Sequence, residues 1–164
     1  MTSESSSETD VPAIPRDVSN AFERFVRGPA LVREAVHGLD AGTLNQRPRG
    51  SDWSIRDVVM HLADAELVGS VQLRLIIAGE EPALPGFDPE AWKRRLHYLW
   101  RDPEFALGLF QQARWANAEL LQQCDAAAWQ RVGLHPDRGR LSLANLVGHL
   151  AEHAGQVRRW RAGP

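Results

Sequence analysis

Cysteine is almost missing from this chain of 164 residues, and its single cysteine, Cys124, excludes an internal disulfide framework. No apolar run approaches the roughly 20 residues that a membrane-spanning helix needs, so we expect no membrane association. The first ten residues also lack the basic and apolar parts of a secretory signal. Together these absences predict a soluble, cytoplasmic protein.

A charge excess of either sign is missing as well. The 19 basic and 21 acidic residues nearly cancel, which leaves no electrostatic footprint for a nucleic acid or an anionic membrane. We therefore predict that the protein binds no nucleic acid. With 43% hydrophobic residues, the chain is long enough for one domain with a sizeable core and too short for two ordinary domains.

The alternation typical of strands is also absent, and apolar residues recur instead at the three- and four-residue steps of amphipathic helices. Residues 1–15 are rich in serine and predict a disordered tail, and residues 16–162 predict one helical domain. Gly28-Pro29 predicts that the first helix is kinked or split into two short collinear helices. Residues 130–141 are predicted as the last loop. The expected fold class is an all-α, antiparallel helical bundle.

Cap residues mark where the later helices are expected to begin. Ser54 with Asp57 three residues on is a capping-box variant, and it opens a long helix to about residue 78. Asp88-Pro89 and Asp102-Pro103 each combine an N-cap with proline at the first helical position, which predicts a helix of about three turns and then a longer one to about residue 124. Ser142 is expected to cap the final helix.

Two histidines stand four residues apart in that final helix, and they predict half of a metal site. On an α-helix the rings of His149 and His153 lie about 40° apart and about 6 Å along the axis, so both can reach one ion. Imidazole suits Zn, Ni, Cu or Fe, and a third ligand is needed. Residues 149–153 also match the zinc-protease signature H-x-x-E-H. In that family the third ligand is a downstream glutamate, however, and no acidic residue follows His153.

A similarity between two stretches of the sequence indicates His61 as the third ligand. The stretch that starts at Ser54 and the stretch that starts at Ser142 have the same order of cap, apolar stripe, histidine, Leu-Ala pair and acid. The other histidines have no equivalent position deep in a well-capped helix; they are His37, His97 and His135. Three imidazoles with an open position are typical of a catalytic site.

Four polar residues lie within about a turn of these histidines in the sequence and are candidates for a general base or for partners of the ligands: Asp64, Glu66, Glu152 and Gln156. A solvated surface position is the commoner status of such side chains, and it is the interpretation that we favour for each.

Three stretches resemble the DinB/YfiT-like proteins: residues 53–66, 135–141 and 143–156. The resemblance implies an up-down-down-up four-helix bundle with a long connection between helices 2 and 3. It also implies a homodimer and a divalent metal ion, usually Zn or Ni, with His61 as the ligand from the second helix. For the fourth helix, counting from Ser142 gives His153 and Val157, and counting back from Gly155 gives His149 and His153. We choose His61, His149 and His153 as the metal ligands.

The resemblance also implies a function. Characterised members of the family include thiol-dependent S-transferases and isomerases that use low-molecular-weight thiols, so we expect a thiol-dependent S-transferase acting on a small-molecule substrate. One alternative is a metal-dependent hydrolase. The other is a non-catalytic bundle that binds a small ligand and has a degenerate metal site.

Overall fold

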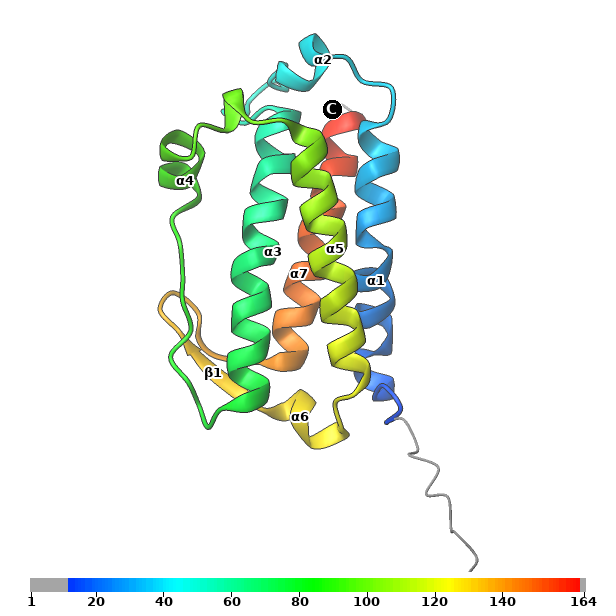
Figure 1. Ribbon diagram of the computed structural model, residues 1–164, viewed down its shortest axis with the longest axis vertical. Helices are drawn as coiled ribbons and strands as arrows, with labels where there is room; N and C mark the ends of the chain where they lie inside the picture. The colour runs from blue at the N-terminus through cyan, green and yellow to red at the C-terminus, as the bar shows by residue number, and fades with distance from the viewer. Residues whose placement is uncertain (1–11, 163–164) are drawn as a thin grey trace, which may run out of the picture.

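Four long helices form the body of the protein (Figure 1). The computed structural model describes the backbone of residues 12–162 and the side chains of residues 12–157, so residues 1–11 of the predicted tail lie outside the described part. The long helices are α1 (Arg16–Val36), α3 (Ile55–Ala78), α5 (Pro103–Gln122) and α7 (Leu143–Ala162). The short elements are α2 (Ala41–Asn45), α4 (Pro89–Arg95), the 3₁₀ turn η1 (Tyr98–Trp100), α6 (Ala126–Gln130), β1 (Val132–His135) and β2 (Gly139–Ser142).

The bundle has the up-down-down-up topology that we expected. In Figure 1, α1 rises, α3 and α5 both descend, and α7 rises again. Because α3 and α5 are parallel neighbours, the chain between them must return along the whole length of the bundle. This long connection, residues 79–102, carries α4 and η1. The predicted fold class, an all-α four-helix bundle with a long connection between its second and third helices, is confirmed.

Local capping chemistry begins the helices where the sequence predicted. The Ser54 hydroxyl accepts from the backbone N–H of Asp57, and the Asp57 carboxylate accepts from the Ser54 N–H at 2.9 Å, which completes a capping box. Asp102 likewise caps α5, which has proline in its first turn. Ser142 accepts from the Asn145 N–H at 3.1 Å at the start of α7.

Gly28-Pro29 neither ends nor splits the first helix, because α1 is one helix with Pro29 inside it. A proline has no N–H, so it leaves the carbonyl of the residue four positions earlier without a helical partner. That carbonyl belongs to Phe25, and it accepts from Arg114 Nη1 at 2.9 Å. A Cβ at Gly28 would lie 2.9 Å from the same nitrogen. The Gly-Pro pair therefore provides both the space and the carbonyl acceptor that the Arg114 guanidinium uses.

Two predictions about the connections were wrong. Residues 132–142 form an antiparallel β-hairpin, in which Val132 pairs with Ser142, rather than a loop. The long connection adds to its edge, because the Leu134 N–H donates to the Pro82 carbonyl at 2.8 Å. The expected three-turn helix after Asp88 ends at Arg95, and His97, at φ 53°, separates it from the 3₁₀ turn. Within residues 12–162, this hairpin is the one paired sheet.

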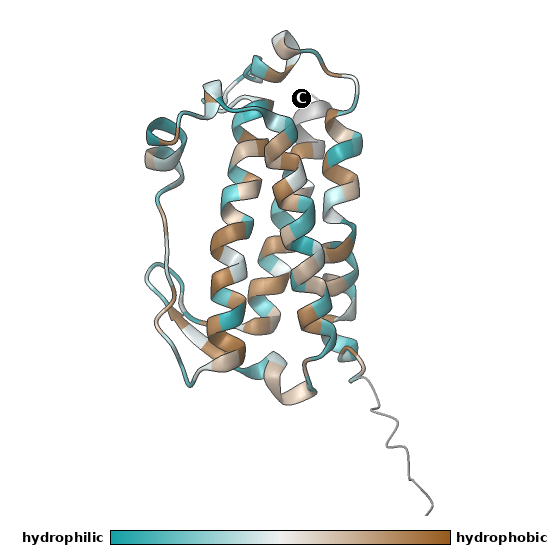
Figure 2. Ribbon diagram, viewed as in Figure 1, coloured by the Kyte–Doolittle hydropathy of each residue, from teal (hydrophilic) through white to brown (hydrophobic). Residues whose placement is uncertain are grey.

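The core consists of two apolar clusters with a polar layer between them. One cluster lies toward the hairpin end of the bundle and includes Phe22 and Trp129, and the other lies toward the α2 end and includes Met60 and Phe110. Figure 2 shows the brown, hydrophobic segments that all four long helices contribute. Between the clusters, Glu66, Arg114 and Asn117 are fully buried.

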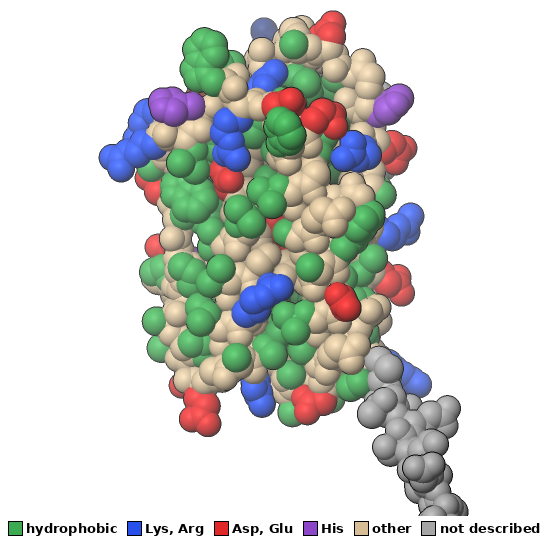
Figure 3. All heavy atoms as spheres, viewed as in Figure 1, with side chains coloured by type: hydrophobic (Ala, Val, Ile, Leu, Met, Phe, Trp, Pro, Cys, Tyr) green, Lys and Arg blue, Asp and Glu red, His purple; other side chains and the backbone are tan. Residues whose placement is uncertain are grey.

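Charged side chains of both signs are scattered over the face drawn in Figure 3 and do not gather into a patch of one sign. None of the described helices is long and apolar enough to cross a bilayer.

Candidate metal centre

The three histidines chosen from the sequence line one cavity of about 290 Å³. Its walls come from four elements: α3, the long connection, the β-hairpin and α7. His61 enters from α3, and His149 and His153 enter from α7. The hairpin contributes a fourth imidazole, His135. The structure therefore brings together residues that lie up to 92 positions apart in the sequence, from 61 to 153.

A glycine on α3 lets the two histidine-bearing helices approach closely. A Cβ at Gly69 would lie 2.9 Å from two Leu150 methyl carbons, so only glycine leaves room for Leu150 in its present position. Leu150 follows His149 directly on α7. This close contact holds α7 against α3 on the side where the imidazoles face the cavity.

The two known ring separations lie on either side of the value expected around a shared ion. The ring centroids of His61 and His153 are 5.6 Å apart, and those of His149 and His153 are 4.0 Å apart. Zinc–nitrogen distances near 2.1 Å and tetrahedral angles would place such centroids about 5 Å apart. Among the described side chains, no three His, Cys, Asp or Glu residues are already arranged to hold an ion. The His149 ring would have to turn away from His153 for all three to share one.

Burial keeps the three imidazoles neutral at pH 7. Burial lowers the pKa of His61 below its usual 6.5, and the nearby Asp64 carboxylate only partly offsets this effect. The pKa of His149 falls to about 4, chiefly because of burial and then because of the Arg138 cation. Burial, followed by repulsion from the protonated forms of His149 and His61, lowers the pKa of His153 to about 3. Neutral imidazole is the form that binds metal ions.

Two of these rings contain a buried nitrogen that the protein does not satisfy. In the described part of the chain, Nδ1 of His61 and Nδ1 of His153 have no hydrogen-bond partner. An unsatisfied buried polar atom costs about 1–3 kcal/mol, and most buried polar atoms in proteins therefore have a hydrogen-bond partner. Several neutral nitrogen donors around one cavity are the set that Zn²⁺ or Ni²⁺ prefers. By this measure the residues fit a divalent ion.

Aromatic side chains pack around His61, and one of them, Phe87, lines the cavity. Trp53 packs edge-on against the His61 ring with centroids 5.3 Å apart, and Phe87 lies 5.7 Å from it on another side. Trp92 in turn packs on Phe87 at 4.5 Å. Ordered apolar walls of this kind exclude water and strengthen electrostatic interactions inside the site.

Position 157, the alternative ligand position on α7, does not face the cavity. Val157 is 1% exposed and belongs to the apolar cluster that contains Met60 and Phe110. His149, one turn before His153, does line the cavity. This geometry agrees with our choice of His149 and His153, although the role of these histidines as ligands stays a prediction.

Two of the carboxylates that we expected at the surface are buried and paired elsewhere. Asp64 accepts from the Tyr98 hydroxyl at 2.8 Å and forms an ion pair with Arg101 at 3.3 Å. Glu66 forms a 2.6 Å ion pair with Arg114 in the polar layer. The solvated interpretation was therefore wrong for both residues, and neither lines the cavity. Glu152 is exposed, as expected.

Sequence reasoning missed the residues that the hairpin brings to the cavity, namely His135, Asp137 and Arg138. The stretch 135–141 was one of the three that carry the family resemblance, and it was the available signal. Placed in a predicted loop, however, it gave no reason to face the helical histidines.

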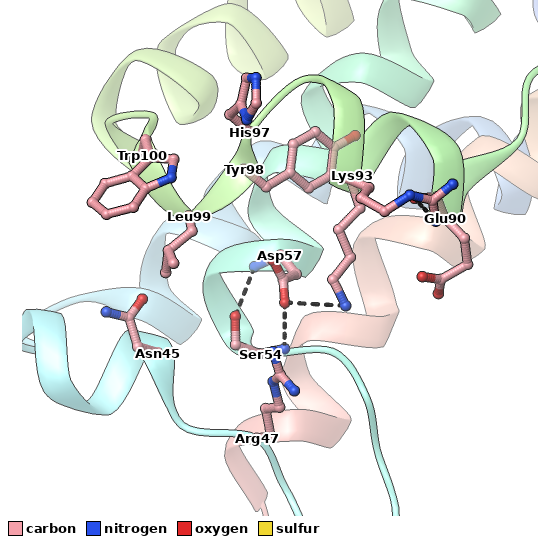
Figure 4. Close-up of a pocket in the computed structure, with 11 residues that line it drawn as sticks. Asn45, Arg47, Ser54, Asp57, Glu90, Lys93, His97, Tyr98, Leu99 and Trp100 are labelled. Atoms are coloured by element: carbon pink, nitrogen blue, oxygen red, sulfur yellow. Dashed lines mark hydrogen bonds and ion pairs between the residues drawn. The ribbon is translucent and has the colours of Figure 1, made fainter.

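A second cavity, of about 310 Å³, lies at the start of α3 (Figure 4). Several of its polar groups bind one another. Lys93 Nζ lies 3.6 Å from the Asp57 carboxylate and also donates to the Asp52 carbonyl, and Asp57 closes the capping box with Ser54. In Figure 4 the His97 ring points away from this paired group. The cavity with the imidazoles is therefore the better candidate for a functional site.

The up-down-down-up bundle and the histidines that face one cavity together describe a class of protein. Comparison with known sequences places the chain in such a class. The sequence profile of the DinB superfamily matches residues 24–158. The chain belongs to the DinB superfamily.

Curated relatives carry names that refer to metal. "Putative metal-dependent hydrolase YfiT" of Bacillus subtilis is 28% identical over 127 residues, which cover 77% of this chain and 71% of that protein. A protein of Bacillus licheniformis with the same kind of name is 26% identical over 151 residues, which cover 89% of this chain and 86% of its own length.

Two solved structures share the fold. The structure of YfiT from Bacillus subtilis has a TM-score of 0.79 at 24% identity and covers 93% of this chain and 92% of its own. The mycothiol-dependent maleylpyruvate isomerase has a TM-score of 0.71 at 12% identity and covers 92% of this chain and 62% of its own. At these identities the two likenesses show the fold alone.

Proposed function

We propose that the protein is a metal-dependent enzyme in which His61, His149 and His153 hold one divalent ion, most simply Zn²⁺ or Ni²⁺. The observation that carries the proposal is the set of three imidazoles, kept neutral by burial, around one cavity, two of them with an unpartnered Nδ1. When bound, such an ion lowers the pKa of a thiol or a water molecule in its open position.

The residues around the cavity favour thiol-dependent S-transfer as the reaction. A protein base close to the attacking water commonly assists metal-dependent hydrolysis, whereas coordination alone deprotonates a thiol. Of the described carboxylates, only Asp137 lines the cavity. His135 is a poor base, because its Nδ1 already accepts from the Asp137 N–H at 3.1 Å. The chain would then bind and orient the thiol between its aromatic wall and the hairpin.

Metal-dependent hydrolysis is the second candidate, and the names of the curated relatives favour it. In that reaction Asp137 would be the base. Asp137→Asn should then lower the hydrolysis rate at least about 100-fold, the lower end of the usual contribution of a general base. For S-transfer we expect the same substitution to change the rate less than about threefold. A single variant thus separates the two reactions.

The S-transferase proposal is tested by turnover. The full chain loaded with Zn²⁺ or Ni²⁺ is assayed with bacillithiol, mycothiol and glutathione against monochlorobimane. We expect metal-dependent conjugation with at least one thiol. His153→Ala should abolish it and His97→Ala, which alters a histidine outside the cavity, should not. Bound metal without turnover for any thiol would contradict the transferase and would leave the hydrolase and the non-catalytic, ligand-binding bundle.

The remaining expectations concern partners and location. The cavity volume, about 290 Å³, suits a small-molecule substrate. We propose a homodimer from the family resemblance, and light scattering of the full chain tests it, since a monomeric mass at micromolar concentration would contradict it. The cytoplasmic location stays a prediction.

A further inference from the structure

We propose that the substrate of this cavity carries an anionic group, such as a carboxylate, and that the tip of the β-hairpin binds this group through Arg138 and His135. This inference deepens the proposed function and rests on it, because it assigns a second binding point to the same cavity. The ion would hold one end of the molecule and the hairpin tip the other.

The arginines of the hairpin region differ in what they bind. Arg140 forms an ion pair with Glu81, and Arg131 donates to the Ile77 carbonyl. Both guanidinium groups are therefore used to hold the hairpin against the rest of the chain. Arg138 lines the cavity, yet within residues 12–157 its side chain has no ion pair or hydrogen bond. It is the cation that remains available to a ligand.

The lining has no net charge without an ion, because the buried imidazoles are neutral and the Asp137 carboxylate offsets the Arg138 cation, so a bound divalent ion would make the cavity positive. The Arg138 cation lies close enough to lower the pKa of both His149 and His153. A divalent ion would add two further positive charges, and the one carboxylate among the described lining residues is Asp137. A thiolate would neutralise only part of this excess. A ligand that also carries a carboxylate would bring the filled cavity close to neutrality, which favours its binding.

His135 supplies a second donor for the same group. Its Nδ1 accepts a hydrogen bond from the Asp137 backbone N–H at 3.1 Å. A neutral imidazole has one donor and one acceptor nitrogen, so an accepting Nδ1 leaves the proton on Nε2. The half-buried ring lines the cavity, so this N–H and the guanidinium of Arg138 belong to one short turn. Hydrogen bonds from a guanidinium or an imidazole N–H to a carboxylate are charge-assisted and roughly twice as strong as those between neutral groups.

A matched pair of thiols tests the inference. Isothermal titration calorimetry compares 3-mercaptopropionate with 3-mercaptopropan-1-ol on the Zn²⁺-loaded full chain, and butyrate with butan-1-ol in a second arm. We expect up to about fivefold tighter binding of 3-mercaptopropionate than of the alcohol, the upper end of the scale for an exposed ion pair. Arg138→Gln should remove this preference while leaving the affinity for the alcohol unchanged. Arg140→Gln, which removes an engaged arginine of the same hairpin, should retain it.

Each other outcome has a separate meaning. Equal affinities for the two thiols in the wild-type protein would overturn the inference and leave the proposed function standing. An equal loss in Arg138→Gln and Arg140→Gln would also overturn it, because general surface charge would then be the cause. If neither thiol binds but butyrate binds and depends on Arg138, the anion site holds and thiol chemistry is wrong. If no probe binds, both proposals fall.

Discussion

Two polar clusters inside this bundle differ in how far the protein itself satisfies their polar groups. In the layer of Glu66, Arg114 and Asn117, the carboxylate, the amide and both terminal guanidinium nitrogens have protein partners, and only Arg114 Nε lacks one. In the histidine cavity, Nδ1 of His61 and Nδ1 of His153 lack partners in the described part of the chain. Among the described residues, the layer satisfies all but one of its polar groups within the protein, whereas the cavity leaves a nitrogen without a partner on two of its rings.

The two clusters are also in contact. Arg114 Nη2 donates to the Leu150 carbonyl at 3.1 Å, and Leu150 lies between His149 and His153 on α7. The same side chain reaches the Phe25 carbonyl on α1 and Glu66 on α3 from its own position on α5. Arg114 therefore joins all four long helices, and it fixes α7 at the turn that presents the two histidines.

Breaking the layer should have the largest effect on stability. Arg114→Met leaves the Glu66 carboxylate buried without its cation, and such a loss costs about 3–5 kcal/mol in the free energy of unfolding. Urea denaturation of the metal-free protein measures it. Adding Glu66→Gln to Arg114→Met should recover part of the loss, because no uncompensated charge then remains.

The matched variant on the other side of the comparison is His153→Ala in metal-free protein. It removes a ring that has no partner for its Nδ1, so we expect a change of less than about 1.5 kcal/mol. Equal losses for Arg114→Met and His153→Ala would contradict this difference between the two clusters.

The pH dependence of the free energy of unfolding gives a second and smaller difference between the two clusters. In the folded protein the pKa values of His149 and His153 fall to about 4 and about 3, below the usual 6.5. Between pH 6.5 and these values the unfolded chain binds more protons than the folded one, so the free energy of unfolding decreases as pH falls. Denaturation of metal-free protein at pH 7 and pH 5 measures this. The double variant His149→Gln, His153→Gln should lose less stability over this range than the wild type, and an equal loss would contradict the lowered pKa values.

The smallest expected effect concerns the ¹⁵N chemical shifts of the His135 ring. If His135 Nδ1 accepts from the Asp137 N–H, its ¹⁵N shift at pH 7.5 should be that of an unprotonated ring nitrogen, and Nε2 should be protonated. Long-range ¹H–¹⁵N spectra of the full chain measure both nitrogens. The opposite tautomer would remove His135 as a donor to the substrate.

Much of the fold could be predicted because its signals are local. The caps at Ser54, Asp102 and Ser142 act within three residues, so they are readable without tertiary structure. The hairpin was missed because its buried positions are Gly133 and Leu141 and its edge partner is the distant Leu84. A strand that buries a glycine against another segment has no apolar alternation to read.

The site divides in the same way. His61, His149 and His153 could be found because their helical spacing and their caps repeat along the chain. Arg138 and Phe87 could not, because a hairpin and a long connection bring them to the cavity. Arg114 and Glu66 were equally hidden, since a charged residue on an amphipathic helix usually faces solvent and only the assembled bundle shows that these two face each other.

Metal analysis of protein purified without an affinity tag tests the central claim most directly. We predict one divalent ion per chain in the wild-type protein and in His97→Ala, and less than about a tenth of that amount after His61→Ala, His149→Ala or His153→Ala, because two imidazoles rarely hold an ion firmly. An ion that stays bound in His149→Ala would contradict the assignment of these three histidines as ligands.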